Sequence, residues 1–349
     1  MPSRLGARRR SVTAAVTLVV VLVVTVVLVR ARSSSSGPAY RLPTAVVPAA
    51  TGNRVFLEPD ERVQSVYAVL RSARARLDMT MYELVDEQAE RILAQDAARG
   101  VRVRVLLDHR LEAKNNAAAY AYLKSHGVQV FWASDRYAAT HQKSVVVDGS
   151  LAAILTLNLT SRYYPTTRDF GVVTTDPADV RAIEEVFEAD IHGRRIAPSA
   201  GEDLVWSPGA RGALVTLITS ARTSIAVESE ELSDGPVVAA LVAAARRGVR
   251  VSLVMTYNRR YAANLTLLAR AGVAVRYYQG EHPLYVHAKA LVVDAGQSGA
   301  RALVGSQNIG PQSLLRDREL GVVLTDPAQV AGVATVLGKD AAGASRWTG

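Results

Sequence analysis

The chain has 349 residues, of which 49% are hydrophobic and none is cysteine. It is long enough for two sizeable hydrophobic cores, and the lack of cysteine excludes a disulfide framework and a thiolate metal site. The formal net charge is +9, but residues 1–32 hold six arginines and no acid, so 35 basic and 32 acidic residues remain. A remainder with a charge of only +3 argues against a nucleic-acid-binding surface.

The N-terminal segment indicates where the protein is located. Four arginines precede an uncharged run over residues 11–29, and two follow it. Residues 12–29 would span about 27 Å as a helix, close to the thickness of a bilayer core and longer than a usual signal-peptide core. We therefore predict a signal-anchor transmembrane segment in residues 1–32 of a single-pass cell-membrane protein, with the folded part outside the cytoplasm. Cleavage of this segment would instead give a secreted protein. Residues 33–53, rich in Ser and Pro, are predicted to be a linker.

Helical and strand patterns alternate along the rest of the chain. In its first half we predict helix, strand, helix and strand at residues 60–76, 77–82, 86–99 and 101–107. Asp86 is the expected N-cap of the second helix, and Gly100 follows its end. In the second half the same order is predicted at residues 214–222, 225–229, 234–247 and 249–255. This alternation is typical of α/β layers with a mixed sheet in each half.

Short sequences recur at a nearly constant offset of 148 to 150 residues. The recurring pairs are residues 72–74 and 220–222, 99–103 and 247–251, and 175–178 and 325–328. Such a period is about one domain long, so it indicates a duplication and not a solenoid. We expect two similar halves, residues 54–195 and 196–349, whose sheets pack side by side about a pseudo-twofold axis.

One chemical motif, His-x-Lys-x4-Asp, occurs in both halves, at residues 141–148 and 287–294. Apolar, strand-forming residues separate Lys from Asp, so each motif should begin on a strand, with His and Lys on one face. An imidazole can act as nucleophile or acid, while a neighbouring ammonium neutralises an anionic oxygen. Each motif is followed by an Asn and then by an acid, namely Asn158 and Asp169, and Asn308 and Glu319. The order His, Lys, Asn, acid is thus kept twice, which points to phosphodiester chemistry.

These residues strongly resemble the phospholipase D superfamily, whose motif is His-x-Lys-x4-Asp-x6-Gly-Ser-x-Asn in two halves of one chain. The resemblance covers residues 54–341. The second copy keeps Gly305 and Ser306, and residues 295–299 read as a widened hairpin turn. The first copy has Leu155 and Thr156 instead, which affects how closely the backbone can approach a phosphate. The resemblance implies two phospholipase D-like α/β/α halves.

A two-step displacement at phosphorus follows from these residues. One histidine attacks the phosphodiester to form a phosphohistidine, and the other, as imidazolium, protonates the departing alcohol. Water or another alcohol then releases the phosphatidyl group. The residues alone are nearly symmetric, so the roles could exchange, while the resemblance implies that His141 is the nucleophile and His287 the acid.

The other site residues divide into three groups by expected role. We expect the non-bridging oxygens to be held by Lys143, Lys289, Asn158, Asn308, Thr156 and Ser306. Asp169 and Glu319 should orient and polarise the imidazoles. Asp148 and Asp294 are expected to be structural, ordering the turn that follows. Two lysines already supply positive charge, so neither a metal nor a cofactor is expected.

Other polar and aromatic residues near the motifs have simpler explanations. Glu83 and Glu231 sit at equivalent strand ends, and they and Asp108 are expected to be exposed loop carboxylates that do not line the cleft. Six tyrosines near the motifs either pack or contact a headgroup such as choline, at positions 137, 163, 164, 257, 261 and 285. The remaining histidines, at positions 109, 126, 192 and 282, show no metal-ligand spacing.

Several functions are compatible with these motifs. The first is a phospholipase D-type hydrolase of phospholipid headgroup esters, favoured by a membrane anchor and a nearly neutral folded part. The second is a phosphatidyl transferase of the cardiolipin synthase kind, which no sequence feature separates from the first. The third is a nuclease, which needs a basic groove that the charge count does not show. A catalytically dead scaffold protein should have lost a His or Lys, and both sets are intact. We expect a phospholipid substrate, no nucleic-acid partner and a monomer.

Overall fold

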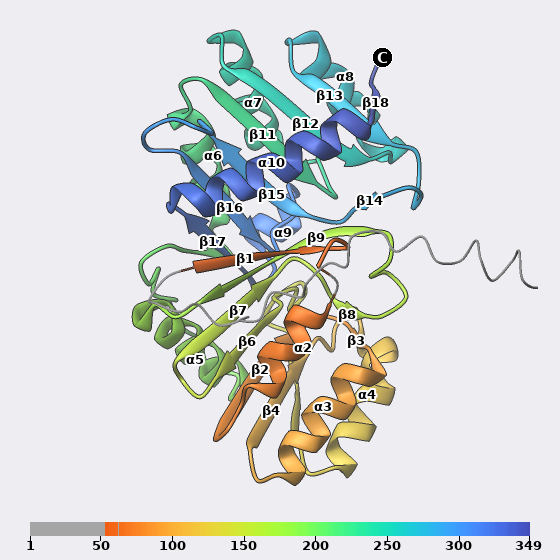
Figure 1. Ribbon diagram of the computed structural model, residues 1–349, viewed down its shortest axis with the longest axis vertical. Helices are drawn as coiled ribbons and strands as arrows, with labels where there is room; N and C mark the ends of the chain where they lie inside the picture. Colours follow the sequence, from red (N-terminus) through yellow and green to blue (C-terminus); the bar gives the residue numbers. More distant parts are fainter. Residues whose placement is uncertain (1–52, 62) are drawn as a thin grey trace, which may run out of the picture. The chain divides into compact units, whose positions relative to one another are not determined.

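The computed structural model describes residues 53–61 and 63–349 (Figure 1). The predicted membrane segment, and the predicted linker except Asn53, lie outside the described residues. Within the described part, no helix is both long enough and apolar enough to cross a membrane. The predicted boundary between the halves falls in the connection between α5 (Pro177–Ile191) and β10 (Leu204–Ser207).

Each half contains one mixed sheet, and the two sheets have the same strand order. The first sheet runs β1 (Asn53–Glu58), β9 (Thr167–Thr174), β7 (Leu151–Leu155), β6 (Ser144–Val147), β2 (Arg76–Met81), β4 (Arg102–Leu107) and β5 (Gln129–Trp132). The second runs β10, β17 (Glu319–Leu324), β16 (Arg301–Gly305), β15 (Lys289–Val293), β11 (Ser224–Ser229), β12 (Arg250–Thr256), β13 (Ala274–Tyr278) and β18 (Ser345–Arg346). Strands β2, β4 and β5 are parallel, as are β11, β12 and β13, while the strands on the other side pair antiparallel. The predicted duplication with mixed sheets is confirmed.

Only β18 has no counterpart in the first sheet among the described strands, whereas two further short parallel pairings occur in both halves, with Thr140–Arg318 and Leu232–Ile309 as the single-bridge versions. β14 (Tyr285–Val286) belongs to the second half of the sequence but pairs with β9 of the first sheet. β3 (Leu84–Val85) pairs with β8 (Leu159–Thr160) apart from both large sheets.

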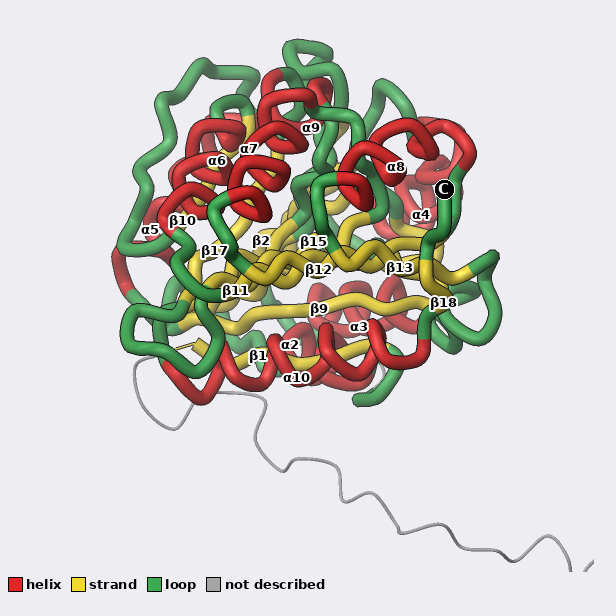
Figure 2. Tube along the Cα trace, turned by 90° about the horizontal axis from the view of Figure 1, so that it is seen from above, coloured by secondary structure: helices red, strands yellow, loops and turns green. Residues whose placement is uncertain are grey.

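Helices cover the outer face of each sheet and fill the space between the two sheets. The outer helices of the first half are α2 (Gln64–Arg71), α3 (Glu87–Ala98) and α4 (Ala113–Ser125). Those of the second half are α6 (Ala210–Ser220), α7 (Gly235–Arg246) and α8 (Ala262–Arg270), the last preceded by the 3-10 turn η1 (Arg259–Tyr261). α5 and α10 (Pro327–Gly343) share one apolar core with the inner faces of both sheets, and α9 (Pro311–Leu315) precedes β17. Figure 2 shows α6, α7 and α8 on one side of the second sheet and α10 on the other.

The predicted helix and strand positions are largely confirmed, with two corrections. Asp86 caps α3 by accepting from the N–H groups of Gln88 and Ala89. The first helix is shorter than predicted, because residues 59–61 form a turn and the helix ends at Arg71. Neither motif begins on a strand: His141 and Lys143 both precede β6, and His287 lies between β14 and β15, which starts at Lys289. The widened hairpin between β15 and β16 is as expected.

The two motif aspartates have a structural role, but they order a different segment from the one predicted. Asp148 accepts hydrogen bonds from the N–H groups of residues 74–76, in the loop that enters β2. Asp294 does the same for residues 222–224 before β11. Both aspartates adopt the left-handed conformation, with φ of 52° and 53°, which aims each carboxylate back at the neighbouring strand's entry.

Candidate active site

Two short backbone pairings between the halves bring the motifs together. Thr140, just before the first motif histidine, forms a parallel bridge with Arg318 of the second half. In the reciprocal place, Val286 pairs with Arg168 of the first half, because β14 lies alongside β9. In both cases a residue just before a histidine is paired with a residue just before an acid. The register therefore sets each histidine beside the acid of the other half.

The side chains confirm this crossed arrangement. Nδ1 of His141 lies 3.0 Å from Oε2 of Glu319, and Nδ1 of His287 lies 2.8 Å from Oδ1 of Asp169. Each acid thereby fixes the orientation of one ring and leaves its Nε2 atom for chemistry. Both histidine side chains are only 13% exposed, so they lie in a partly closed site. The predicted orienting role of the two acids agrees with the geometry, and the crossing adds that neither half has a complete site.

Two buried arginines form ion pairs across the interface between the halves. Arg168 donates from Nε and Nη2 to the carboxylate of Asp340 on α10, at 2.5 and 3.1 Å. Arg318 lies against Asp190 on α5, with Nε 2.9 Å from Oδ2 and Nη2 donating to Oδ1 at 3.1 Å. Each pair joins one half to the other, and each arginine directly precedes a motif acid, Asp169 or Glu319, in the sequence. These bidentate ion pairs fix the position of the acid strands.

The two motif hydroxyls support the acid strands. Thr156 is fully buried, donates to Oδ1 of Asp169 at 2.5 Å and accepts from the N–H of Phe170. Ser306 is also fully buried, and its hydroxyl accepts from the N–H of Leu320, next to the other acid. These hydrogen bonds position the acid strands, and contact of the two hydroxyls with phosphate oxygens stays a prediction.

The two lysines have different surroundings. Lys143 is fully buried, donates to the backbone oxygen of His141 at 2.7 Å and lies 4.9 Å from the centre of the Tyr82 ring. Lys289 donates to the backbone oxygen of His287 and also to Oε2 of Glu230 at 2.9 Å. Both ammonium groups lie where they can bind a phosphodiester at the facing histidines.

Glu230 is a site residue that the sequence analysis missed. It follows β11, and its Oε2 atom lies 3.5 Å from Nε2 of His287 as well as close to Lys289. Tyr285 donates to its other oxygen at 3.0 Å. The corresponding residue of the first half, 148 positions earlier, is Tyr82, which packs edge-on against His141. One histidine therefore faces an aromatic ring where the other faces a carboxylate.

This difference breaks the symmetry between the histidines. Burial, together with the charges of Lys143 and Lys289, lowers the pKa of His141 well below its usual value, so this ring is neutral. His287 lies between two carboxylates, which stabilise positive charge on it. Burial raises the pKa of Glu230, but the nearby Lys289 and His287 outweigh it, and the pKa is lowered overall, which keeps this carboxylate ionised. The neutral ring suits a nucleophile, and the ring that lies between two carboxylates suits an acid.

Two further groups titrate near neutrality. Burial and the charge of Lys289 lower the pKa of Lys143 to about 7. Burial also raises the pKa of Glu319 to about 7, against the opposing effect of Lys143. An anionic phosphate beside Lys143 would favour its charged form, so substrate binding and protonation are coupled.

The amides that follow the motif strands occupy comparable places. The Oδ1 atoms of Asn158 and Asn308 are buried without a hydrogen-bond partner among the described residues. Their binding of phosphate oxygens stays a prediction. Leu155, which replaces the expected glycine, points into the apolar core beneath α2, α3 and α4. Its side chain therefore lies away from the site and does not obstruct it.

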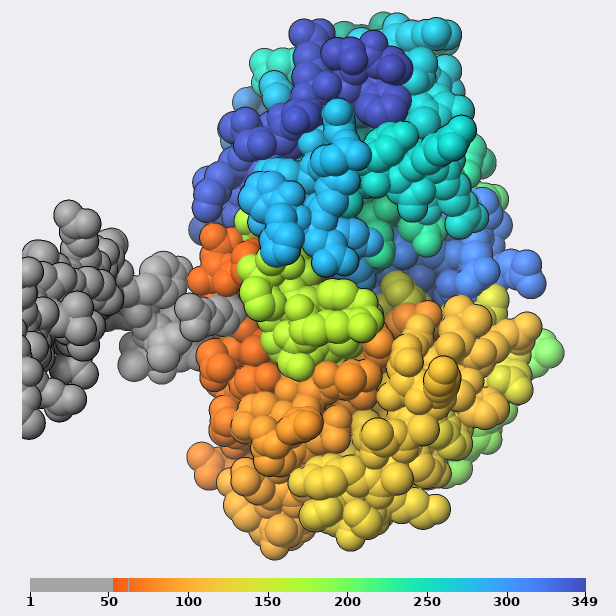
Figure 3. Space-filling model, turned by 90° about the vertical axis from the view of Figure 1, so that its right-hand side faces the viewer, coloured from red at the N-terminus to blue at the C-terminus, as the bar shows by residue number. Residues whose placement is uncertain are grey.

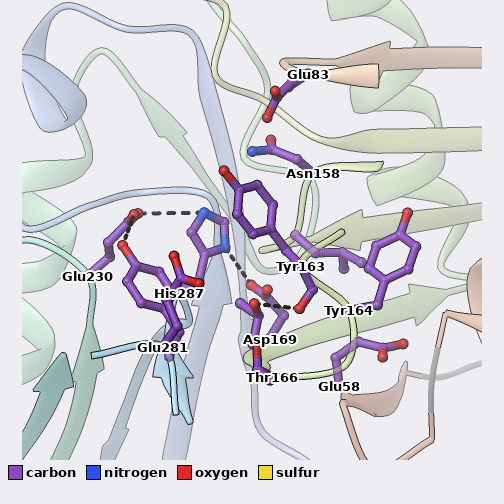
Figure 4. A pocket seen from close by; sticks show the side chains of 13 residues that line it. Glu58, Glu83, Asn158, Tyr163, Tyr164, Thr166, Asp169, Glu230, Glu281 and His287 are labelled. Atoms are coloured by element: carbon purple, nitrogen blue, oxygen red, sulfur yellow. Dashed lines mark hydrogen bonds and ion pairs between the residues drawn. The ribbon is translucent and has the colours of Figure 1, made fainter. Parts of the chain in front are cut away.

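A cavity of about 220 Å³ opens beside His287. We call it the side pocket, and its lining residues are Glu58, Glu83, Leu157, Asn158, Tyr163, Tyr164, Thr166, Thr167, Asp169, Glu230, Glu281, Tyr285 and His287. Figure 4 shows Asp169 and Glu230 on either side of the His287 ring, with Asn158 and Tyr163 nearby. The segments near residues 160–167 and 280–285 meet in the surface view of Figure 3, and the N–H of Tyr285 donates to the oxygen of Thr166 there.

Other residues considered from the sequence have varied positions. Glu83 is buried and lines the side pocket, so the prediction that it is an exposed carboxylate was wrong. Asp108 is also buried, and it accepts from the N–H of Thr140, which helps to place the first motif. Glu231 does not line the side pocket. Among the six tyrosines considered, those at positions 163, 164 and 285 line the pocket, and the other three pack elsewhere. Within the described residues, no group of three or more His, Asp or Glu side chains could hold a metal ion.

The arrangement can move a phosphoryl group through a covalent intermediate. A neutral imidazole and an imidazole between two carboxylates belong to one site, two lysines flank it, and the acids that orient the rings come from opposite halves. The fold and the site thus define an enzyme of phosphodiester chemistry with two motifs in one chain.

Comparison with known proteins agrees with this class. The sequence profile described as "Cardiolipin synthase, PLD-like domain" matches residues 66–191 and 214–340. The chain therefore belongs to this family of the phospholipase D superfamily.

Curated relatives of the chain are named cardiolipin synthases. The protein of Geobacillus kaustophilus is 25% identical over 338 residues, an alignment that covers 82% of this chain and 65% of that protein. Cardiolipin synthase A of Klebsiella pneumoniae strain 342 is 25% identical over 340 residues, covering 79% and 66%. The chain thus spans about 65% of the length of the first of these relatives.

Two solved structures share the fold. Phosphatidylserine synthase of Haemophilus influenzae has a TM-score of 0.65 at 15% identity, covering 88% of this chain and 90% of that one. Polyphosphate kinase of Porphyromonas gingivalis has a TM-score of 0.64 at 15% identity, covering 83% and 50%. At these identities the likeness concerns the fold alone.

Proposed function

We propose that the protein is a phosphatidyl transferase, which moves a phosphatidyl group from one alcohol to another through a phosphohistidine at His141. The observation that carries the proposal is the crossed pairing of the histidines with Glu319 and Asp169, at 3.0 and 2.8 Å, around a partly closed site. Transfer is favoured over hydrolysis because the relatives are named cardiolipin synthases. Hydrolysis, placed first from the sequence, is then the same reaction with water as the acceptor.

In the first step, Nε2 of His141 attacks the phosphorus of the donor lipid. The N–P bond forms while the P–O bond to the headgroup alcohol breaks, and His287 gives its proton to the departing oxygen. Lys143 and Lys289 neutralise the phosphate oxygens as their charge grows. Lys289 also donates to Glu230 in the free site, so this carboxylate competes with the phosphate for that ammonium.

In the second step, an incoming alcohol replaces the first one beside His287. This histidine, now neutral, takes the alcohol's proton as the new P–O bond forms and the N–P bond breaks. Asp169 and Glu230 stabilise the imidazolium that results, and the enzyme returns to its starting state. The low exposure of both rings limits the access of water and so favours an alcohol that the site can bind.

The test uses the full chain in vesicles that contain phosphatidylglycerol and phosphatidylcholine, with a free alcohol added and a chelator present. We expect a phosphatidyl ester of the added alcohol, and its loss in His141→Ala and His287→Ala. His192→Ala is the matched control, because this histidine is 55% exposed on the end of α5, outside the side pocket.

The products separate the competing functions. Phosphatidic acid without any transfer product would restore the hydrolase. Cleavage of DNA or RNA without lipid turnover would move the protein to the nuclease branch of the superfamily. Location in the membrane through residues 1–32, with the site outside the cytoplasm, remains part of the proposal and supports a lipid substrate.

A further inference from the structure

The side pocket is rich in carboxylates and poor in cations. Five acidic residues line it, at positions 58, 83, 169, 230 and 281, and its lining residues include no Lys or Arg. Asp169 and Glu230 are already paired with His287 and Lys289, so Glu58, Glu83 and Glu281 are the acids left for a ligand. A phosphate carries negative charge, so these carboxylates are not suited to the phosphate itself. They surround the space next to the histidine that protonates the departing alcohol.

Two of these carboxylates have no counterpart in the other half. Glu58 is opposite Asp169 on neighbouring strands, and in the second half Ser207 is opposite Glu319 in the same way. Glu230 likewise corresponds to Tyr82. The two-histidine chemistry is served by both halves, so it does not require acids on one side only. Glu58 and Glu230 instead make the space beside His287, where the alcohol leaves or enters, more acidic than the corresponding space beside His141.

Glu58 is the most unusual of the five. It is 1% exposed, it lines the side pocket, and neither of its carboxylate oxygens has a hydrogen-bond partner among the described residues. Burial, and the neighbouring carboxylates of Asp169, Glu61 and Asp60, raise its pKa to about 9, with Arg168 acting in the opposite direction. A buried acid without a partner is costly, and a bound cation would relieve that cost.

Aromatic rings complete the pocket. Tyr163 is 37% exposed, and Figure 4 shows its ring among the pocket side chains, between Asn158 and His287. The hydroxyl of Tyr164 donates to Asp86, and that of Tyr285 donates to Glu230, so these two rings are fixed in place. Carboxylates combined with tyrosine faces form the chemical environment that binds organic ammonium groups.

We propose that the side pocket binds the ammonium group of the alcohol that is exchanged at His287, so that the preferred donor headgroup or acceptor is an amino or quaternary ammonium alcohol. The exchange of an alcohol at His287 rests on the proposed function. The binding of an ammonium group does not, since the pocket and its acidic lining are present whatever the reaction is. It differs from what the relatives' names suggest, because the headgroup alcohol of a cardiolipin donor or acceptor carries no cation.

The experiment compares two alcohols of the same shape. Choline has a positively charged quaternary nitrogen at the position where 3,3-dimethylbutan-1-ol has a neutral quaternary carbon. The two alcohols compete as acceptors for the full chain in phosphatidylglycerol vesicles. We expect choline to be preferred by about tenfold or more, through a lower KM. The same site is tested with the leaving alcohol when the rates from phosphatidylcholine and phosphatidylglycerol vesicles are compared with one neutral acceptor, because choline leaves from the first lipid and glycerol from the second.

Variants assign the preference to the pocket. Glu281→Gln, at the exposed mouth, and Glu58→Gln, in the wall, should each lower the ratio of choline to neutral transfer by about fivefold or more. Glu185→Gln is the matched control, because this glutamate is exposed on α5 outside the pocket and should leave the ratio unchanged. The mouth variant keeps the test decisive if the buried variant fails to fold.

Binding is measured separately from turnover, as protection against thermal unfolding by each alcohol. Transfer that proceeds equally with both alcohols would overturn the ammonium site while the proposed function stands. Protection by choline alone, without transfer to any alcohol, would support the site and reject the proposed function. Protection should also weaken as pH falls, because a cation favours the ionised form of Glu58 and is bound with release of its proton.

Discussion

The division of roles between the two histidines can be tested by changing the leaving group. An ordinary alkyl alcohol needs a proton to leave, whereas p-nitrophenol leaves readily as an anion. If His287 is the acid, then His287→Ala should damage the first reaction much more than the second. If His141 is the nucleophile, then His141→Ala should abolish both.

The surroundings of His287 support its role as the acid. Carboxylates lie 2.8 and 3.5 Å from its ring nitrogens. With an effective dielectric constant of about 20, unit charges at these distances attract by about 6 and 5 kcal/mol. These carboxylates hold an imidazolium in position beside the departing oxygen. The magnitude itself comes from general acid catalysis, which contributes about 10²- to 10⁴-fold.

The assay follows p-nitrophenol release from its phosphatidyl ester, beside the ethyl ester. His287→Ala should lose about 10³-fold on the ethyl ester and less than about tenfold on the first turnover of the nitrophenyl ester. It should release one p-nitrophenol per protein in a burst, since no base remains to activate the acceptor. His141→Ala should show no burst. A burst in His141→Ala that is absent from His287→Ala would show that the roles are the reverse of those we assign.

Three further predictions concern the charges around the site. Glu230→Gln removes the carboxylate that pairs with Lys289, so this lysine is free to bind phosphate and KM for a neutral-headgroup ester should fall about tenfold. The value of kcat should also fall, because His287 loses a neighbouring carboxylate. A higher KM in steady-state assays would contradict this. The pH profile of kcat/KM should peak near 7, because catalysis rises as Glu319 ionises and falls as Lys143 loses its proton. Glu319→Gln should remove the acidic limb, and a profile unchanged by it would refute the assignment. Asp340→Ala removes the two hydrogen bonds that Arg168 donates to this carboxylate, while Arg168 keeps its contacts with Asp60 and with the backbone oxygen of Glu58. The free energy of unfolding in urea should fall by about 1.5–3 kcal/mol, and a loss below about 0.5 kcal/mol would count against the cross-half ion pair.

The duplication and the site residues could be read from the sequence because they repeat in register. His, Lys, Asn and acid recur in order in both halves, and the helix and strand patterns recur around them. Such repetition reports what each half contains. It does not report which half supplies the partner of a given side chain, so the pairing of His141 with Glu319 depends on the tertiary register of Thr140 and Arg318.

The missed residues are of two kinds. Asp190 and Asp340 follow the repeat, and their partners precede the catalytic acids, so a search for repeated charges within helices could have found them. Glu230 and Glu58 break the repeat instead, since the other half has Tyr82 and Ser207. Positions at which two copies differ next to a shared motif are therefore the signal for specificity.

The buried hydroxyls show a limit of motif reasoning. Thr156 and Ser306 are polar and adjacent to the site in sequence, which favoured a role on the substrate. In the folded chain they are fully buried, and they hold the acid strands through hydrogen bonds. Both residues come directly after a strand, β7 or β16, and their hydrogen bonds depend on the neighbouring acid strand, which the motif alone does not give.

The central claim is that the phosphatidyl group passes through His141, and its most direct test is to find the intermediate. The full chain is mixed with a phosphatidyl donor, quenched during turnover at alkaline pH and digested, and the peptides are analysed by mass spectrometry. The account predicts a phosphatidyl mass on His141, which disappears when an acceptor alcohol is added before the quench. Turnover with no such adduct, or an adduct on His287 alone, would contradict it.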